Sequence, residues 1–282
     1  MDALSRAFGL NSGSGGRPVS SENETRPPAG EKPDELPFAA PCRDLHPLAA
    51  FGWLRRGWRD LAAAPRQSLC YGVVVVLASY AASLVAWKLG GVWLLLAMAS
   101  GFLFVGPLMA IGVYEISRQL ERGTRPTLAE GIRETSQHVG NALVYAIVVL
   151  VVFLVWARAA SMVHIFFPAE TNHSWLDLVP FLAIGSAVGA IFASIIFAAS
   201  AFSLPMIADR RTDTVTAVVT SVNAVLRNKL AMIVWAALVV GAILASFATA
   251  FLGLAVVIPL LGHATFHAYR ETIDAGAWPP AD

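Results

Sequence analysis

Charged residues are scarce in this sequence. Asp, Glu, Lys and Arg make up 14% of its 282 residues, whereas a soluble domain usually contains about 25%. Residues 230–262 contain none of them, and hydrophobic residues make up 56% of the chain. A helix needs roughly 20 mainly apolar residues to cross a bilayer, and several apolar runs approach or exceed that length without a polar face. The composition therefore predicts a membrane protein and argues against a large soluble helical core.

Other absences exclude several classes of protein. There are two cysteines, Cys42 and Cys70, and no C-x-x-C motif, so neither a disulfide framework nor a zinc knuckle is expected. The formal net charge of +1 gives no electrostatic reason to expect a nucleic-acid partner. The motifs G-x-S-x-G, H-E-x-x-H and the Walker A loop are missing, and we therefore expect no enzymatic activity.

The chain divides into three regions by composition. Residues 1–45 are rich in Gly, Pro, Ser and acidic residues. They are expected to form a disordered cytoplasmic tail, because they cannot bury enough apolar surface to offset the entropy of ordering. They also lack the apolar segment of a cleavable signal peptide. Residues 46–270 are expected to form a six-span membrane domain, and residues 271–282 a short polar tail.

Six apolar stretches in the membrane domain are expected to form transmembrane helices. They cover about residues 68–87, 92–117, 139–156, 178–208, 229–247 and 252–269. Lys88, Gly90 and Gly91 are expected to form a short turn between the first two. The short alternating segments of a membrane barrel are missing, so the predicted fold class is all-α, a polytopic transmembrane helical bundle. The last two stretches together are barely long enough for two crossings, and a re-entrant hairpin is the alternative there.

The spans form three pairs in an internal repeat, at about residues 46–117, 126–208 and 212–270. An amphipathic helix is expected at the membrane interface before each pair. Apolar stripes at helical spacing predict two of these helices, with Leu48, Phe51, Leu54, Trp58, Leu61 and Ala62 in residues 46–64, and Val215, Val218, Val219, Val222 and Leu226 in residues 209–227.

A proline lies in the second span of each repeat. Pro107, Pro205 and Pro259 are expected to kink these helices, because proline removes a backbone donor and its ring clashes with the carbonyl four residues earlier. Small neighbouring residues would allow the kinked helices to pack closely.

The positive charges predict the orientation in the membrane. Of the 20 Lys and Arg residues, 18 lie on the side of the termini and the amphipathic segments, and only Lys88 and Arg158 lie toward the other side. Positive charge is retained on the cytoplasmic side of a membrane. Both termini and the amphipathic helices are therefore predicted to be cytoplasmic.

Gly185 and Gly189 form a G-x-x-x-G ridge in the fourth span. Such ridges let helix backbones approach closely. We expect this one to pack against another helix of the same chain, and a homo-oligomer is the alternative.

His263 and His267 are the strongest candidate for a metal or haem site. They are four residues apart, so both rings lie on one helix face, and neutral imidazole is a common metal ligand. Two ligands do not complete a site, although His46 and His138 are predicted on the same side of the membrane and could add to it. The interpretation we favour is that the two histidines form hydrogen bonds at the inner interface, and we expect no cofactor.

Ionisable residues are missing from the middle of every predicted span. Ion-coupled transporters and proton pumps usually need such groups, and their absence counts against a transporter. Glu115 lies near the inner end of the second span, where we expect an ion pair with Arg118 or Arg122 rather than a proton relay.

Four segments together resemble a known bacterial family. They are GWRDL, GPLMAIGVYEISRQLERG, LPMIADRRTDTVTAVVTSVNAVLRN and IPLLGHATFHAYR. They are similar to the predicted integral membrane proteins called domain of unknown function 2189, over about residues 46–272. The resemblance implies a polytopic helical protein of the bacterial inner membrane and brings no established activity. Some members carry a label suggesting a cytochrome oxidase subunit, but the several histidine ligands of a haem-copper core are not evident here.

Three functions follow as hypotheses. The first is a non-enzymatic membrane component that binds a membrane-protein partner or the lipid bilayer, indicated by interfacial helices on one side and the lack of buried charges. The second is a small-molecule permease, indicated by the paired spans and the prolines. The third is a metal- or haem-binding protein associated with the respiratory chain, using His263 and His267.

Overall fold

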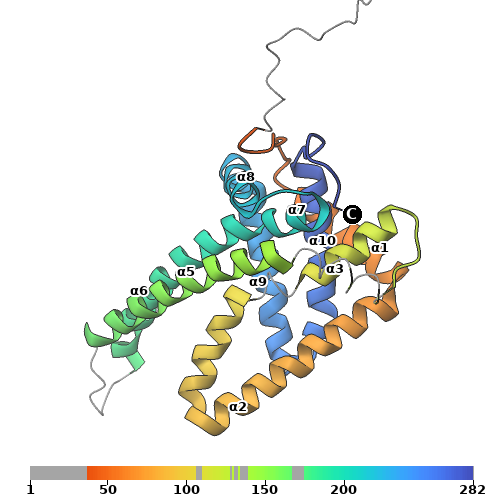
Figure 1. The fold of residues 1–282 in the computed structure, drawn as a ribbon. Helices are drawn as coiled ribbons and strands as arrows, with labels where there is room; N and C mark the ends of the chain where they lie inside the picture. Colours follow the sequence, from red (N-terminus) through yellow and green to blue (C-terminus); the bar gives the residue numbers. More distant parts are fainter. Residues whose placement is uncertain are drawn as a thin grey trace, which may run out of the picture. The chain divides into compact units, whose positions relative to one another are not determined.

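A computed structural model describes residues 37–105, 110–127, 129, 133, 139–166 and 175–281. The regular structure of these residues is α-helical, which confirms the all-α fold class. The helices are α1 (Ala49–Ala63), α2 (Pro65–Val105), α3 (Ile111–Glu121), α5 (Val139–Phe166), α6 (Trp175–Ser200), α7 (Ser203–Asp209), α8 (Thr214–Arg227), α9 (Lys229–Ala248) and α10 (Leu254–Thr272), as Figure 1 shows.

Three stretches in the described part of the chain are long and apolar enough to cross a membrane. They are Pro65–Gly91, Ala183–Asp209 and Lys229–Ala248, and they coincide with the first, fourth and fifth predicted spans. A shorter apolar stretch, Leu143–Ala159, overlaps the third. The total of six spans and their arrangement in three pairs stay predictions.

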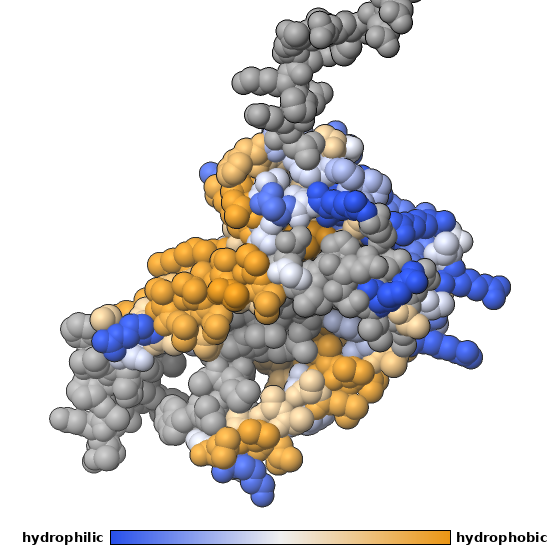
Figure 2. Space-filling view, in the orientation of Figure 1, coloured by the Kyte–Doolittle hydropathy of each residue, from blue (hydrophilic) through white to orange (hydrophobic). Residues whose placement is uncertain are grey.

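Apolar side chains cover the outside of these helices. Figure 2 shows hydrophobic surface over α2, α5 and α6. Exposed apolar patches of this size mark a surface that meets lipid or another protein. The exposed side chains include Val73, Leu77 and Leu84 on α2, Leu143 and Leu154 on α5, Ile184 and Ile191 on α6, and Ile233 and Leu244 on α9.

A glycine turn ends the first membrane stretch where the sequence predicts it. Gly91 has φ 60° and ψ −149°, and this non-helical residue separates two helical segments within α2. A positive φ costs glycine little because it has no Cβ. The turn predicted at Lys88–Gly91 is therefore confirmed.

α10 is the helix on which the others assemble, because α1, α2, α3, α7 and α9 all contact it. Small residues allow α1 and α3 to approach α10 closely. A Cβ added to Gly57 of α1 would lie 2.7 Å from the backbone nitrogen of Ala264, and one added to Gly262 of α10 would lie 2.8 Å from Cγ1 of Val113 in α3. Both distances are below van der Waals contact, so larger residues would push the helices apart.

The close contact of α2 with α10 lies at a backbone carbonyl that Pro259 leaves without its helical donor. Proline has no N–H, so the carbonyl of Ala255, four residues earlier, lacks its usual helical donor. A Cβ added to Gly72 of α2 would lie 1.9 Å from that carbonyl oxygen. The bare Cα of Gly72 therefore sits directly against the carbonyl that the proline leaves unpaired, where a Cα–H···O contact can form.

Replacing Gly72 with leucine should destabilise the protein, because the side chain cannot fit beside the Ala255 carbonyl. Overpacking of this kind costs typically about 1–3 kcal/mol or more. Thermal denaturation of purified protein in detergent would measure the loss. Gly241→Leu is the matched control, since nothing lies within 4 Å of a Cβ at that position of α9. Equal Tm values for the two variants would contradict the close α2–α10 contact.

The fourth predicted span is broken before Pro205. α6 ends at Ser200, and α7 begins at Ser203, so Pro205 lies in the first turn of α7, where a missing N–H costs little. The fourth predicted span therefore consists of two helices, and Pro205 follows the break between them. Ser221 of α8 stabilises the break, since its hydroxyl accepts from the N–H of Phe202 at 3.0 Å and donates to the carbonyl of Ala198 at 2.7 Å.

The other two prolines predicted to kink helices are Pro259 and Pro107. Pro259 lies inside α10, which runs on through it to Thr272. Pro107 falls outside the described residues.

The predicted ridge of Gly185 and Gly189 has no close neighbour within the described residues. Within the described part of the chain, no atom lies within 4 Å of a Cβ built at either glycine. Packing at this ridge stays a prediction, and the close glycine contacts lie elsewhere, at Gly57, Gly72 and Gly262 among others.

α1 and α8 each turn large apolar side chains outward, and the buried face of α8 is made of small residues. The buried face of α1 is Ala50, Trp53, Gly57 and Leu61, whereas Leu48, Phe51 and Trp58 are more than half exposed. The buried face of α8 is Thr214, Thr216, Ala217, Thr220, Ser221 and Ala224, whereas Val215 and Leu226 are 59% and 58% exposed. The predicted apolar stripes are therefore divided: Leu48, Phe51, Trp58, Val215 and Leu226 point away from the protein, whereas Leu61 is buried and Leu54, Val218, Val219 and Val222 are half-buried.

Segments near both termini lie against the helices. Residues 37–45, expected in the amino-terminal tail, are held by hydrogen bonds from the N–H of Ala40 to Thr220 and from the N–H of Leu45 to Asn228, at 2.9 and 2.8 Å. Residues 273–281, expected in a polar tail, bury Trp278 and Ala281. Hydrogen bonds to their backbone groups hold both segments against the helices. Local composition does not reveal such partners.

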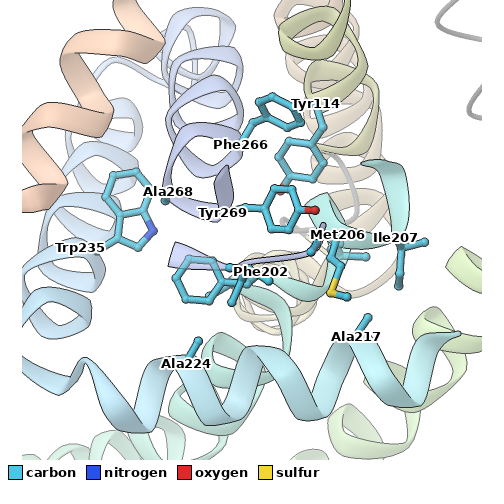
Figure 3. Packing of buried hydrophobic residues seen from close by; sticks show 14 of the residues in the cluster. Tyr114, Phe202, Met206, Ile207, Ala217, Ala224, Trp235, Phe266, Ala268 and Tyr269 are labelled. Carbon is cyan, nitrogen blue, oxygen red and sulfur yellow. The ribbon is translucent and has the colours of Figure 1, made fainter. Parts of the chain in front are cut away.

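Aromatic side chains fill the core between α3, α7, α8 and α10. Figure 3 shows Phe202 between α10 and α8, with Tyr269 beside Met206. Phe202, Met206, Phe266 and Tyr269 are each at most 1% exposed. This core fixes the carboxyl-terminal half of α10, which carries the two candidate histidines.

Asp213 caps the amino terminus of α8, where its Oδ1 accepts from the N–H of Thr216 at 2.9 Å. Burial raises the pKa of this carboxyl, but hydrogen bonds from the backbone N–H groups of Thr216 and Val215 lower it, and the net shift is downward. A depressed pKa means that the cap contributes stability above the unfolded pKa of about 3.9 and loses it as the pH falls through the folded pKa.

Asp213→Ala should therefore lower stability near neutral pH by about 0.5–2 kcal/mol, the usual cost of losing an N-cap. The difference from wild type should shrink as the pH falls below about 4. Denaturation at several pH values would measure it. Asp213→Ser should retain most of the stability because serine also caps helices. A serine variant as unstable as the alanine variant would show that the cap is not the cause.

Candidate functional site

His263 lies at the centre of a buried polar cluster. Its ring is fully buried, and so is Ser68. Nε2 lies 2.9 Å from Oγ of Ser68 in the first turn of α2, and Nδ1 lies 2.6 Å from Oγ of Ser117 in α3. Both ring nitrogens therefore have hydrogen-bond partners on neighbouring helices.

Asp60 of α1 joins the two histidines. Its Oδ2 accepts from Oγ of Ser117 at 3.0 Å and lies 2.9 Å from Nε2 of His267. The same oxygen lies 3.9 Å from Nδ1 of His263. The helical spacing of the histidines thus places both rings on one face, as predicted, and that face meets a carboxylate.

The donor directions of the cluster follow from Asp60. Because Ser117 donates its only hydroxyl proton to Asp60, its oxygen must accept from Nδ1–H of His263. Nε2 then carries no proton and accepts from Ser68. We infer a chain of donors from Ser68 through His263 and Ser117 to the carboxylate, in which each buried polar group is paired.

This arrangement favours hydrogen bonding over metal binding at the histidines. Neither nitrogen of His263 has a lone pair free of a serine, and a metal would need to displace one of these bonds. The described ranges contain no group of three or more His, Cys, Asp and Glu placed to hold a metal. Nδ1 of His46 accepts a hydrogen bond from the N–H of Leu48 at 3.2 Å. His138 falls outside the described ranges. The metal or haem site stays a prediction.

A second polar group lies between α3, α7 and the carboxyl-terminal segment. Glu115 and Arg118 form an ion pair at 2.7 Å with both side chains buried, as expected for Glu115. Arg118 also donates to the carbonyls of Ala208 and Ala281. A buried charge needs such partners to offset its lost hydration. The pair therefore ties the carboxyl-terminal segment to α3 and α7.

Asp209 completes this second group. Its Oδ2 accepts from the hydroxyl of Tyr269 at 2.9 Å and from Nη1 of Arg270 at 3.2 Å. Arg270 also pairs with Glu121 at 2.7 Å. Sequence reasoning missed Asp60, Ser68, Ser117 and Asp209, because each lies far along the chain from the residues it contacts.

Residues 94–209 match the model of the family described as a predicted integral membrane protein, DUF2189. The match confirms the family resemblance over the stretch from the second predicted span to the end of α7. It is shorter than the range indicated by the motifs and leaves α1, His263 and His267 outside it. No curated protein and no solved structure matches the chain.

The family match and the long apolar helices of this chain together indicate an integral membrane protein with several membrane helices. The match brings no function. The bacterial inner membrane, the orientation and the internal repeat stay predictions.

Substitution of the two histidines separates a structural role from a metal site. His263→Ala should be strongly destabilising, because it leaves the buried Ser68 and Ser117 hydroxyls short of a partner at about 1–3 kcal/mol each. His267→Ala should cost less, since that side chain is 19% exposed and Asp60 keeps its bond from Ser117. Thermal denaturation measures both. Equal losses, together with equal loss of a bound metal, would instead indicate a shared ion.

Proposed function

We propose that this protein is a non-enzymatic component of the bacterial inner membrane that holds α1 and α8 at the cytoplasmic interface, where they bind lipid or a membrane partner. The observation that carries the proposal is the outward direction of the apolar residues on these helices. Val215 and Leu226 are exposed while the hydroxyl-bearing face of α8 is buried. In water this arrangement would be unfavourable, whereas at a bilayer surface it buries apolar area.

The position of the two helices supports the same proposal. A single residue, Ala64, separates α1 from the membrane stretch beginning at Pro65, and a single residue, Asn228, separates α8 from the stretch beginning at Lys229. A helix joined so closely to a membrane span ends at the level of the membrane surface. The distribution of Lys and Arg supports the cytoplasmic surface.

The contacts of the polar clusters agree with a scaffold rather than a catalyst. Ser68 and His263 form a hydrogen bond but are both fully buried, and Ser117 is 1% exposed. A nucleophile and base must reach a substrate. In the described structure these residues instead connect α1, α2, α3 and α10, and they hold α1 in place on α10.

Spin labels on α8 would test the interfacial position. In a background with Cys42 and Cys70 replaced by alanine, labels at Val215→Cys and Leu226→Cys should be more accessible to oxygen than to a water-soluble nickel complex in proteoliposomes. Electron paramagnetic resonance measures both accessibilities. Val240→Cys in α9 is the control for greater depth, and the exposed Gly276→Cys is the control for water.

Nickel accessibility at both α8 positions equal to that at Gly276→Cys would contradict the proposal. It would place the apolar face of α8 in water or under a soluble partner.

A further inference from the structure

The outward face of α1 combines apolar and cationic side chains. Phe51 and Trp58 are 53% and 57% exposed. Arg55 and Arg59 are exposed as well, and they lie one helical turn apart, Arg55 between the two aromatic residues and Arg59 directly after Trp58. Arg66, in the first turn of α2, is also exposed and follows α1 by three residues.

These three arginines differ from most arginines of the protein. Within the described residues, carboxylate partners are found for several others: Arg56 with Glu271, Arg118 with Glu115, Arg210 with Asp209, Arg227 with Asp44 and Arg270 with Glu121. The Arg227 guanidinium, by hydrogen bond and charge, lowers the pKa of Asp44. For Arg55, Arg59 and Arg66 the same part of the chain supplies no carboxylate within ion-pair distance. Within the described residues, these three exposed cations are therefore available to an external anion.

The place of these cations indicates what that anion is. Arg66 is the second residue of the membrane stretch Pro65–Gly91, so its side chain lies where a bilayer has its headgroups. Tryptophan prefers this level because its ring is apolar and its N–H is polar. A guanidinium binds phosphate oxygens through two parallel hydrogen bonds. α8 presents an apolar face too, but its Arg227 is already paired with Asp44.

We propose that Arg55, Arg59 and Arg66 form a binding site for the headgroup of an anionic phospholipid, with Phe51 and Trp58 beside its acyl chains. The site deepens and rests on the proposed function, because it requires α1 to lie at the membrane interface. It specifies the lipid: a phosphatidylglycerol-like anion is preferred to a zwitterionic lipid.

Native mass spectrometry of the full-length protein tests this site. Purified protein in detergent is titrated with phosphatidylglycerol or phosphatidylcholine, and bound lipids are counted. Wild type should bind phosphatidylglycerol more tightly. Arg55→Gln/Arg59→Gln/Arg66→Gln should weaken that binding on the order of tenfold or more, since each basic residue near the surface adds attraction for anionic lipid, and should leave phosphatidylcholine binding unchanged.

The control variant is Lys88→Gln/Arg125→Gln/Arg158→Gln. It removes the same charge from three exposed positions on separate parts of the chain and should keep the preference for phosphatidylglycerol. Equal weakening in the control would overturn the site, because net charge would then explain the preference. Unchanged binding in the Arg55/Arg59/Arg66 variant would also overturn it. Loss of the bound lipid in excess inorganic phosphate would show an anion site that does not require lipid.

A label at Phe51→Cys, in the cysteine-free background, separates this site from the proposed function. It should report interfacial depth in both triple variants. Interfacial depth without anion preference would leave the proposed function intact and overturn the lipid site. A label in water would remove both.

Discussion

Close backbone packing on α10 is the constraint on which the rest of this structure depends. In lipid, helices gain little from hydrophobic burial against each other, so association relies on short contacts between small residues. Gly57, Gly72 and Gly262 provide those contacts with Ala264, Ala255 and Val113. The Gly72 contact is coupled to Pro259, because the proline leaves the Ala255 carbonyl without its helical donor. Gly72 and Pro259, which lie far apart in the sequence, thus together allow α2 to pack closely on α10.

This packing also produces the polar cluster. When α1, α2 and α3 approach α10, Asp60, Ser68 and Ser117 arrive around His263 within hydrogen-bond distance. Buried polar groups are expensive unless paired, and here the chain of donors ends on a carboxylate that also meets His267. The cluster therefore stabilises one arrangement of α1, α2, α3 and α10 over others. It specifies the position of α1, and with it the direction of Phe51 and Trp58.

The amphipathic helices show how an apolar stripe can be recognised and still be oriented differently from a soluble helix. In a soluble protein the stripe of α8 would pack inward, whereas here Thr216, Thr220 and Ser221 are buried and Val215 and Leu226 point out. Ser221 explains part of this choice, because its hydroxyl satisfies the break between α6 and α7. The small polar face is a structural contact surface, and the apolar face remains for the membrane.

The amino-acid sequence was sufficient to predict that helices form and that several are suited to a membrane, because uninterrupted apolar runs leave no other way to satisfy the backbone in lipid. It also located the turn at Gly91, the Glu115–Arg118 pair and the shared face of His263 and His267, which depend on local spacing. Only the tertiary structure decided that helix α6 stops before Pro205, that residues 37–45 and 273–281 pack on the helices, and that His263 bonds two serines. Those outcomes depend on contacts such as Ser68 with His263 or Asp209 with Tyr269, between residues far apart in the chain. Local periodicity carries no record of such partners, because the free energy that selects them arises only when the helices meet.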